Sequence, residues 1–134
     1  MSRKRLSKLH VFAGSFPSRD AACLHTERQW EPEPDESASD EEYAAWEDRN
    51  PTWAFRDELG TRLESEFIET IDGHRRYQYL GGYLNTEDVD SVRELAGDAN
   101  ILVLVFPDAI EDPKVKLKST SELLYCGSFD FVWP

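Results

Sequence analysis

The sequence has no apolar run long enough to cross a membrane. Its longest apolar stretch, Ile101–Phe106, is far shorter than the roughly 20 residues that a transmembrane helix needs. The start of the chain, Met-Ser-Arg-Lys-Arg-Leu, is not followed by an apolar segment of the kind that a signal peptide contains. We therefore expect a cytoplasmic protein with no membrane partner.

Cysteine is also scarce, because Cys23 and Cys126 are the only two in the chain. They form no CxxC pair and have no spacing typical of metal ligands. We expect two buried free thiols rather than a disulfide.

Motifs of catalysis are missing as well. The sequence contains no glycine-rich phosphate loop, no HExxH and no GxSxG, and its histidines (His10, His25 and His74) are scattered. Cys23 and His25 lie two positions apart in a predicted helix, so their side chains point about 200° apart and cannot pair. For Cys126, a buried structural role is favoured over catalysis with a distant histidine.

Carboxylate chemistry receives no better support. Glu66 and Glu69 would share a face if their segment were helical, and paired carboxylates can act as acid and base; a solvated pair is the favoured interpretation. The acidic stretch lacks the order of ligands that builds a calcium loop. We predict no enzyme activity, no catalytic residue, no cofactor and no metal site.

Positive charge is absent where negative charge is densest. From Glu31 to Asp48 the chain has nine carboxylates and no lysine or arginine, with Tyr43 and Trp46 among them. Like charges at this density repel one another, so the segment destabilises the fold unless counterions or a cationic partner offset the repulsion.

The whole chain is acidic, with 134 residues and a net charge of −12. Its start is the exception, because Arg3, Lys4, Arg5 and Lys8 give the first eight residues a charge of +4. A body this acidic repels phosphate, so we expect no direct binding of nucleic acid. It attracts basic proteins and speeds their association. The oligomeric state stays open, with a monomer preferred.

The length fits one domain. We expect residues 1–7 to be a flexible basic N-terminus, and residues 8–134 to form a single α+β domain with an acidic, proline-containing loop at 31–48. The predicted fold is a mixed or antiparallel sheet with about three helices packed on it.

Three stretches predict strands. Leu9–Phe16 and Ile101–Phe106 are apolar on both faces, as in strands covered on both sides. Residues 123–133 form the last predicted strand, with a break at Gly127 that is typical of a bulge or turn.

Capping signals predict the helices. Ser18 begins one that runs to about Gln29, and Asn50-Pro51 opens another that ends at Gly60. Asn85 and Thr86 begin a third, which ends at Gly97, and residues 40–48 suggest a short fourth. The expected inward-facing residues are Ala21, Cys23 and Leu24 in the first; Phe55 and Leu59, beside Trp53, in the second; and Val89, Val92, Leu95 and Ala96 in the third.

The segment from 65 to 80 has two interpretations. Asp72-Gly73 favours a hairpin in which Phe67–Ile71 pairs with His74–Leu80. The alternative is a helix over Ser65–Ile71.

Several stretches together resemble the immunity protein 22 family of bacterial polymorphic toxin systems. They are Leu9–Phe16 (LHVFAGSF), Phe55–Gly60 (FRDELG) followed by Glu66–Glu69 (EFIE), and Asn100–Phe106 with Leu124–Phe131 (LYCGSFDF). Their order spans most of residues 8–133. The resemblance implies an α+β protein that is made beside a toxin, binds it and protects the producing bacterium, with no catalytic residue and no cofactor.

We predict that the partner is a cognate toxin domain that is basic. A nuclease fits this description, because a nuclease site must hold phosphate. The predicted toxin-binding residues are Glu36, Asp40, Glu41, Glu42, Tyr43, Trp46, Glu47 and Asp48. In this interpretation the carboxylates provide charge and Trp46 provides a buried anchor.

Other interpretations stay open. The carboxylates fit a solvated loop equally well, and Trp46 fits equally well as a side chain that docks the loop on its own core. Trp30, Trp53 and Trp133 are expected in the core. A different functional class, an acidic adaptor or nucleic-acid mimic that binds a basic host regulator, is the main alternative, followed by a small hydrolase.

Overall fold

The computed structural model describes residues 7–112 and 114–131. The predicted N-terminal tail therefore lies almost wholly outside the described residues, as does Trp133. The sheet has four antiparallel strands in the order β2-β3-β1-β4. The strands are β1 (Ser7–Gly14), β2 (Ile68–Ile71), β3 (Ile101–Val105) and β4 (Leu124–Phe131).

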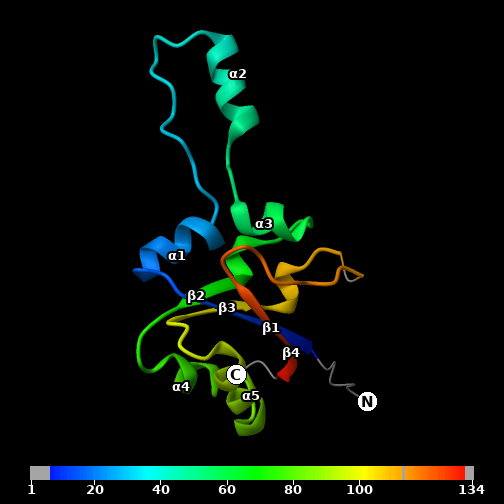
Figure 1. The fold of residues 1–134 in the computed structure, drawn as a ribbon. Coiled ribbons are helices and arrows are strands. Elements are labelled where there is room, and N and C mark those ends of the chain that lie inside the picture. The colour runs from blue at the N-terminus through cyan, green and yellow to red at the C-terminus, as the bar shows by residue number, and fades with distance from the viewer. Residues whose placement is uncertain (1–6, 113, 132–134) are drawn as a thin grey trace.

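Helices lie on both faces of this sheet, and one stands away from it (Figure 1). The α-helices are α1 (Arg19–Thr26), α2 (Asp40–Arg49), α3 (Ala54–Leu59), α4 (Arg76–Leu80) and α5 (Thr86–Ala96), and the short 3-10 turns are η1 (Ser65–Phe67) and η2 (Pro107–Ala109). The prediction of an α+β fold with an antiparallel sheet is confirmed.

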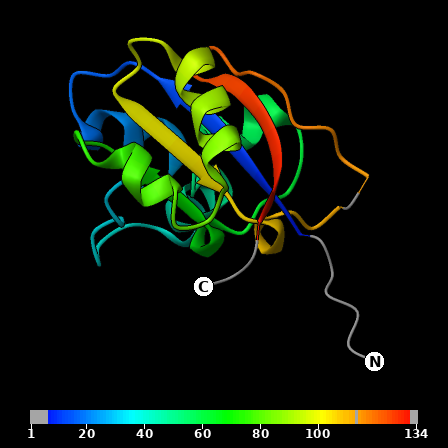
Figure 2. The same ribbon diagram turned by 90° about the horizontal axis from the view of Figure 1, so that it is seen from below.

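Two apolar cores explain why β3 is buried along its whole length. On one face, Leu102 and Leu104 pack with α4 and α5, which cross the sheet as Figure 2 shows. On the other face, Ile101, Val103 and Val105 pack with residues of α1 and α3. β1 alternates in the same way, which confirms both as central strands covered on both faces.

Gly127 produces the predicted irregularity in β4. It has a φ of 119°, and the pairing of β1 with β4 shifts register between Val11 and Phe12. Because a bulge adds one residue to one strand, Cys126 and Phe131 both face the core beside α5. Neither Cys23 nor Cys126 is in a disulfide, although Cys23 is only partly buried.

Helix α1 begins as predicted, with the Ser18 hydroxyl accepting a hydrogen bond from the Ala21 N–H. It ends at Thr26 rather than near Gln29, and the predicted inner face is wrong. The buried side chains are Ala22, His25 and Thr26, whereas Leu24 is 64 % exposed. The hydroxyl of Thr26 bonds the hydroxyl of Thr70 in β2 at 2.7 Å in the interior. This bond turns the Thr26 side of α1 toward the sheet.

The prediction of a helix opened by Asn50-Pro51 is also wrong at its start. Helix α3 begins at Ala54, while Asn50 ends α2, where its N–H bonds the Trp46 and Glu47 carbonyls. The end of the prediction holds, since Gly60 follows α3 with a φ of 70°. Phe55 is buried, as predicted.

Neither interpretation of residues 65–80 is fully correct. Ile68–Ile71 is a strand, but it pairs with β3, and the chain after Gly73 returns as helix α4. Tyr77 and Leu80, three positions apart, bury one side of that helix. The apolar face of the sheet therefore receives a helix where the turn signal predicted a strand.

Helix α5 matches its prediction closely, with the Asn85 side chain accepting a bond from the Asp88 N–H. Val89 and Val92 are buried, but Leu95 is 53 % exposed and does not belong to the packed stripe.

Candidate interaction site: the acidic arm

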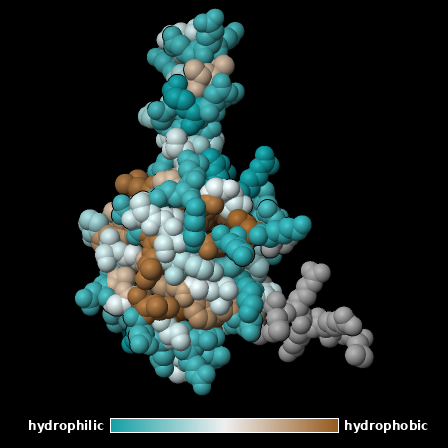
Figure 3. Space-filling model, turned by 45° about the vertical axis from the view of Figure 1, so that its right-hand side comes forward, coloured by the Kyte–Doolittle hydropathy of each residue, from teal (hydrophilic) through white to brown (hydrophobic). Residues whose placement is uncertain are grey.

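Residues 31–50 form a projection that we call the acidic arm. Its base is a two-residue bridge, in which the Gln29 N–H donates to the Thr52 carbonyl at 2.7 Å and the Thr52 N–H donates to the Gln29 carbonyl at 2.9 Å. The chain thus leaves and rejoins the body at one point. The arm stands off the body and is mostly hydrophilic on its surface (Figure 3).

Helix α2 forms at the tip for local reasons. The Ser39 hydroxyl accepts a bond from the Glu42 N–H at 3.1 Å, and the first turn is acidic. Carboxylates near a helix N-terminus are favourable because the free N–H groups there carry partial positive charge. None of the residues of α2 is buried, so the predicted short helix is confirmed but contributes nothing to either core.

Aromatic side chains hold α2 against residues 30–33, the segment that leaves the body. The Trp46 ring lies between Trp30 and Tyr43, with ring centroids 5.9 and 5.5 Å away. Its Nε1–H donates to the Glu31 carbonyl at 3.1 Å. The Tyr43 hydroxyl donates to Glu33 Oε1 at 2.9 Å, and this bond raises the pKa of Tyr43. The arm therefore has a small aromatic cluster of its own.

Glu31 closes the base of the arm. Its Oε2 accepts bonds from Asn50 Nδ2 at 3.0 Å and from Arg49 Nε at 2.9 Å, and these bonds lower the pKa of Glu31. The Asn50 side chain also accepts a bond from the Glu31 N–H at 2.8 Å. Asn50 thus acts here as a clasp between the two ends of the arm, which explains why it does not cap α3.

The predicted site residues separate into groups. Tyr43 and Trp46 lie on the side of α2 that faces residues 30–33, so they order the arm. At 100° per residue, Glu41 and Asp48 lie together on the opposite side, with Ala44 and Ala45 between them. Asp40, Glu42 and Glu47 flank this side, and Glu36 lies in the preceding loop. All six acidic site residues are exposed: Glu36, Asp40, Glu41, Glu42, Glu47 and Asp48.

Trp30 is the residue that the sequence interpretation misplaced. It was expected in the core, yet it is 58 % exposed at the base of the arm, where it contacts Trp46. Its neighbours Gln29 and Glu31 are polar, and this local signal favours a surface position. Trp46 reaches neither core, so the alternative in which it docks the loop on the body is wrong. Trp53 is buried, as expected.

Two further candidate residues, His25 and Cys126, lie in the interior of the body. His25 is buried, and its Nε2 lies 3.1 Å from the Thr120 hydroxyl and 3.5 Å from Glu58 Oε2. Burial lowers the pKa of His25 although Glu58 opposes this. Burial also raises the pKa of Cys126 to about 11, so this thiol is protonated and weakly nucleophilic at neutral pH.

Glu66 and Glu69 do not share a helix face, because Glu66 is in η1 and Glu69 is in β2. In the part of the chain that the structure describes, no three His, Cys, Asp or Glu side chains gather as they would around a metal ion. Over the same residues, no helix combines the length and apolar character needed to cross a bilayer.

No protein-family model, no curated protein and no solved structure matches this chain.

Proposed function

We propose that this protein is an immunity protein, which neutralises a basic toxin domain by stoichiometric binding through the acidic arm. The observation that carries the proposal is that the arm is internally ordered and yet packs on neither core. Glu31 pairs with Arg49, and no other arm carboxylate takes part in a salt bridge within residues 7–112 and 114–131. Its charge is therefore available to a partner.

The arrangement of α2 supports this role. Glu41 and Asp48 are seven residues apart, so about 10 Å of helix separates two carboxylates on the outward side. Ala44 and Ala45 between them leave room for the long side chains of lysine or arginine. Because the clasp and the aromatic cluster already hold the arm, binding loses less conformational entropy than it would with a disordered loop.

The resemblance to the immunity protein 22 family supports the same conclusion from another part of the chain. The resembling stretches fall on β1, α3, η1 with the start of β2, β3 and β4, all of which belong to the body. The arm lies between the first and second of them. A body that resembles the family, with an arm outside the resembling stretches, fits a protein whose partner choice depends on the arm.

The test is a binding titration against the C-terminal domain of a large secreted toxin encoded beside this gene. The arm variant carries Asp40→Asn, Glu41→Gln, Glu42→Gln, Glu47→Gln and Asp48→Asn. A matched control neutralises five exposed carboxylates of the body: Glu87, Asp90, Glu94, Asp98 and Asp108. Both variants have the same net charge, so only the location differs.

We expect the arm variant to lose at least about tenfold in affinity at low salt, since losing one buried, charge-paired anchor costs about 2–5 kcal/mol. The control should keep most of its affinity, and co-expression with the toxin should then protect cells only when the arm is intact. Equal affinities for the two variants would remove the arm from the mechanism. Binding to a host regulator in place of the toxin would favour the adaptor alternative.

A further inference from the structure

The aromatic cluster of the arm, formed by Trp30, Trp46 and Tyr43, leaves one ring largely open. The three rings lie in a row, in which Trp46 contacts both of the others. Trp30 is at one end and is 58 % exposed, whereas Tyr43 at the other end is 38 % exposed. Trp46, in the middle, is partly buried. The Trp30 ring therefore contacts an aromatic neighbour on one side and keeps open surface for a partner.

The indole N–H of Trp30 is open as well. Trp46 donates its Nε1–H to the Glu31 carbonyl, and Trp53 donates its own to the Thr26 carbonyl. Within residues 7–112 and 114–131, the Nε1–H of Trp30 has no acceptor. Tryptophan is enriched among the residues that dominate binding, and its N–H finds a partner when the ring is buried. Trp30 has both the exposed ring and the free donor that such a contact uses.

The backbone on both sides of Trp30 is fixed. Before it, Gln29 exchanges two hydrogen bonds with Thr52. After it, the Glu31 N–H donates to Asn50 Oδ1 at 2.8 Å. Because these bonds already hold the main chain, placing the ring against a partner costs little conformational entropy.

Charge selects a cation as the occupant of this ring. Residues 31–50 contain nine carboxylates and a single arginine, Arg49, which pairs with Glu31. Glu31 and Glu33 each use one carboxylate oxygen for bonds inside the arm. Their other carboxylate oxygens have no hydrogen bond in the described part of the chain. Acceptors for a cation therefore remain on the arm.

Elsewhere the chain supplies cations to its own rings. The Arg56 guanidinium lies 5.9 Å from the centre of the Trp53 ring, and that of Arg93 lies 4.5 Å from the centre of the Tyr77 ring. No arginine or lysine among the described residues takes this position on Trp30. The face of an aromatic ring attracts a cation, and arginine is favoured over lysine because its guanidinium is planar and more weakly hydrated.

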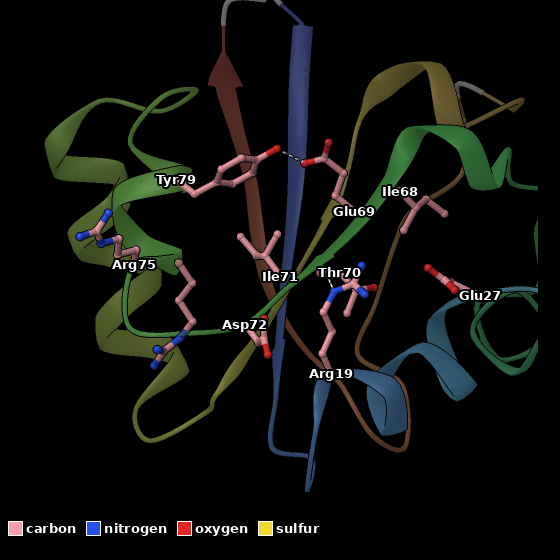
Figure 4. Close-up of a pocket in the computed structure, with 10 residues that line it drawn as sticks. Arg19, Glu27, Ile68, Glu69, Thr70, Ile71, Asp72, Arg75 and Tyr79 are labelled. Carbon is pink, nitrogen blue, oxygen red and sulfur yellow. Dashed lines mark hydrogen bonds between the residues drawn. The ribbon is translucent and has the colours of Figure 1, made fainter.

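The body offers a contrasting surface in the groove beside β2 (Figure 4). This hollow of about 510 Å³ lies between α1 and α4. Its charged lining is balanced, with three arginines and three carboxylates: Arg19, Arg75 and Arg76 with Glu27, Glu69 and Asp72. Tyr79 in the same lining is 43 % exposed. An exposed ring that shares its hollow with arginines of its own chain is a suitable comparison for Trp30.

We propose that the aromatic cluster is an arginine-binding site, in which the guanidinium of an arginine on the partner stacks on the open side of the Trp30 ring and donates to carboxylates of the arm. The inference rests on the proposed function, which makes the arm the surface that meets a basic partner, and it names the side chain that the arm selects. The sequence pattern favoured Trp46 as the anchor. In this proposal Trp46 positions Trp30, and Trp30 makes the contact.

The test titrates three blocked peptides into the full chain at low salt and follows the indole N–H signals by NMR. The first is Gly-Arg-Gly-Arg-Gly. In the second, lysine replaces both arginines and keeps the charge; in the third, citrulline keeps the planar shape without the charge. We expect the arginine peptide to shift the Trp30 signal saturably and to bind about twofold or more tightly than the lysine peptide. The citrulline peptide should cause no saturable shift.

Two variants locate the contact. Trp30→Leu keeps an apolar side chain beside Trp46 but removes the aromatic face, so it should weaken binding of the arginine peptide about two- to fivefold, the size of an exposed cation–π contact. It should also abolish the preference over lysine. Tyr79→Leu removes a ring of similar exposure from the groove and should bind like the wild type. The amide signal of Glu42, whose N–H donates to the Ser39 hydroxyl, shows in each variant whether α2 is intact.

Equal affinities of the arginine and lysine peptides for the wild type would overturn the proposal, and so would unchanged affinity in Trp30→Leu or shifts confined to the groove beside β2. The charge-neutralised arm variant should bind both cationic peptides more weakly and keep the preference for arginine. If the toxin titration shows no dependence on the arm while the preference for arginine persists, the proposed function fails and the arginine site stands. The two tests can therefore fail independently.

Discussion

Removing the acidic arm should leave the body folded and should not lower its stability. The change replaces residues 31–50 with a short glycine-serine linker between Trp30 and Pro51. The geometry permits it because Gln29 and Thr52 are already hydrogen-bonded to each other. The side chains of α2 are absent from both cores, so excision opens no cavity.

The magnitude follows from chain entropy and charge. Shortening a closed loop from about 20 to about 4 residues lowers the entropic cost of closure by about 1.4 kcal/mol. Excision also removes nine carboxylates and Arg49, which changes the net charge from −12 to −4 and reduces repulsion. The hydrogen bonds of the clasp are lost together with both of their partners, which is close to neutral at an exposed site.

Urea unfolding of the wild type and the excised variant, followed by far-UV circular dichroism, measures the difference. We expect the free energy of unfolding to stay equal or to rise by about 1 kcal/mol. A loss of more than about 2 kcal/mol, a size typical of core or network disruption, would refute the conclusion that the arm is energetically separate from the body.

Two further predictions concern the body. Trp53→Ala should destabilise the protein by about 3–5 kcal/mol in the same urea assay, because the Trp53 ring is 2 % exposed and its Nε1–H donates to the Thr26 carbonyl; a loss below about 1 kcal/mol would contradict its place in the core. Stability should also fall as the pH drops below about 6.5, the ordinary pKa of histidine, since burial lowers the pKa of His25 in the folded state and the unfolded chain binds the proton more readily. The stabilisation is present above the unfolded pKa and is lost as the pH falls through the folded one. His25→Asn should reduce the change in unfolding free energy between pH 7.5 and 5.5. A smaller change due to His10 should remain, because burial also lowers the pKa of His10. If the pH dependence of stability is unchanged in the variant, His25 is not its cause.

Local signals explain which predictions succeeded. Ile101–Val105 is apolar at every position, which only a strand with two covered faces can accommodate. Ser18 and Asn85 begin helices because their own side chains accept a hydrogen bond from the first turn. Gly60 ends a helix because glycine adopts the left-handed backbone conformation without strain. The composition of residues 31–48 likewise suggested an acidic loop with a short helix at residues 40–48, and α2 forms there.

Predictions failed where a distant residue made the decision. Asn50 has the side chain of a helix cap, but Glu31 and Trp46 use it to close the arm. Residues 74–80 follow a hairpin turn, yet β2 pairs with β3 and leaves a sheet face that α4 covers. Trp30 was expected in the core, but it lies exposed at the base of the arm, where it contacts Trp46.

The sequence by itself therefore determined most of the helices and strands, the acidic charge and the position of that charge along the chain, because propensity, capping and electrostatic repulsion act between near neighbours. Only the tertiary structure decided that the acidic residues stand on a projecting arm, that Tyr43 and Trp46 order this arm from within, and that β2 is left at a free edge. These features depend on contacts between segments far apart in the chain, and residue patterns carry little information about which of several compatible partners a segment meets.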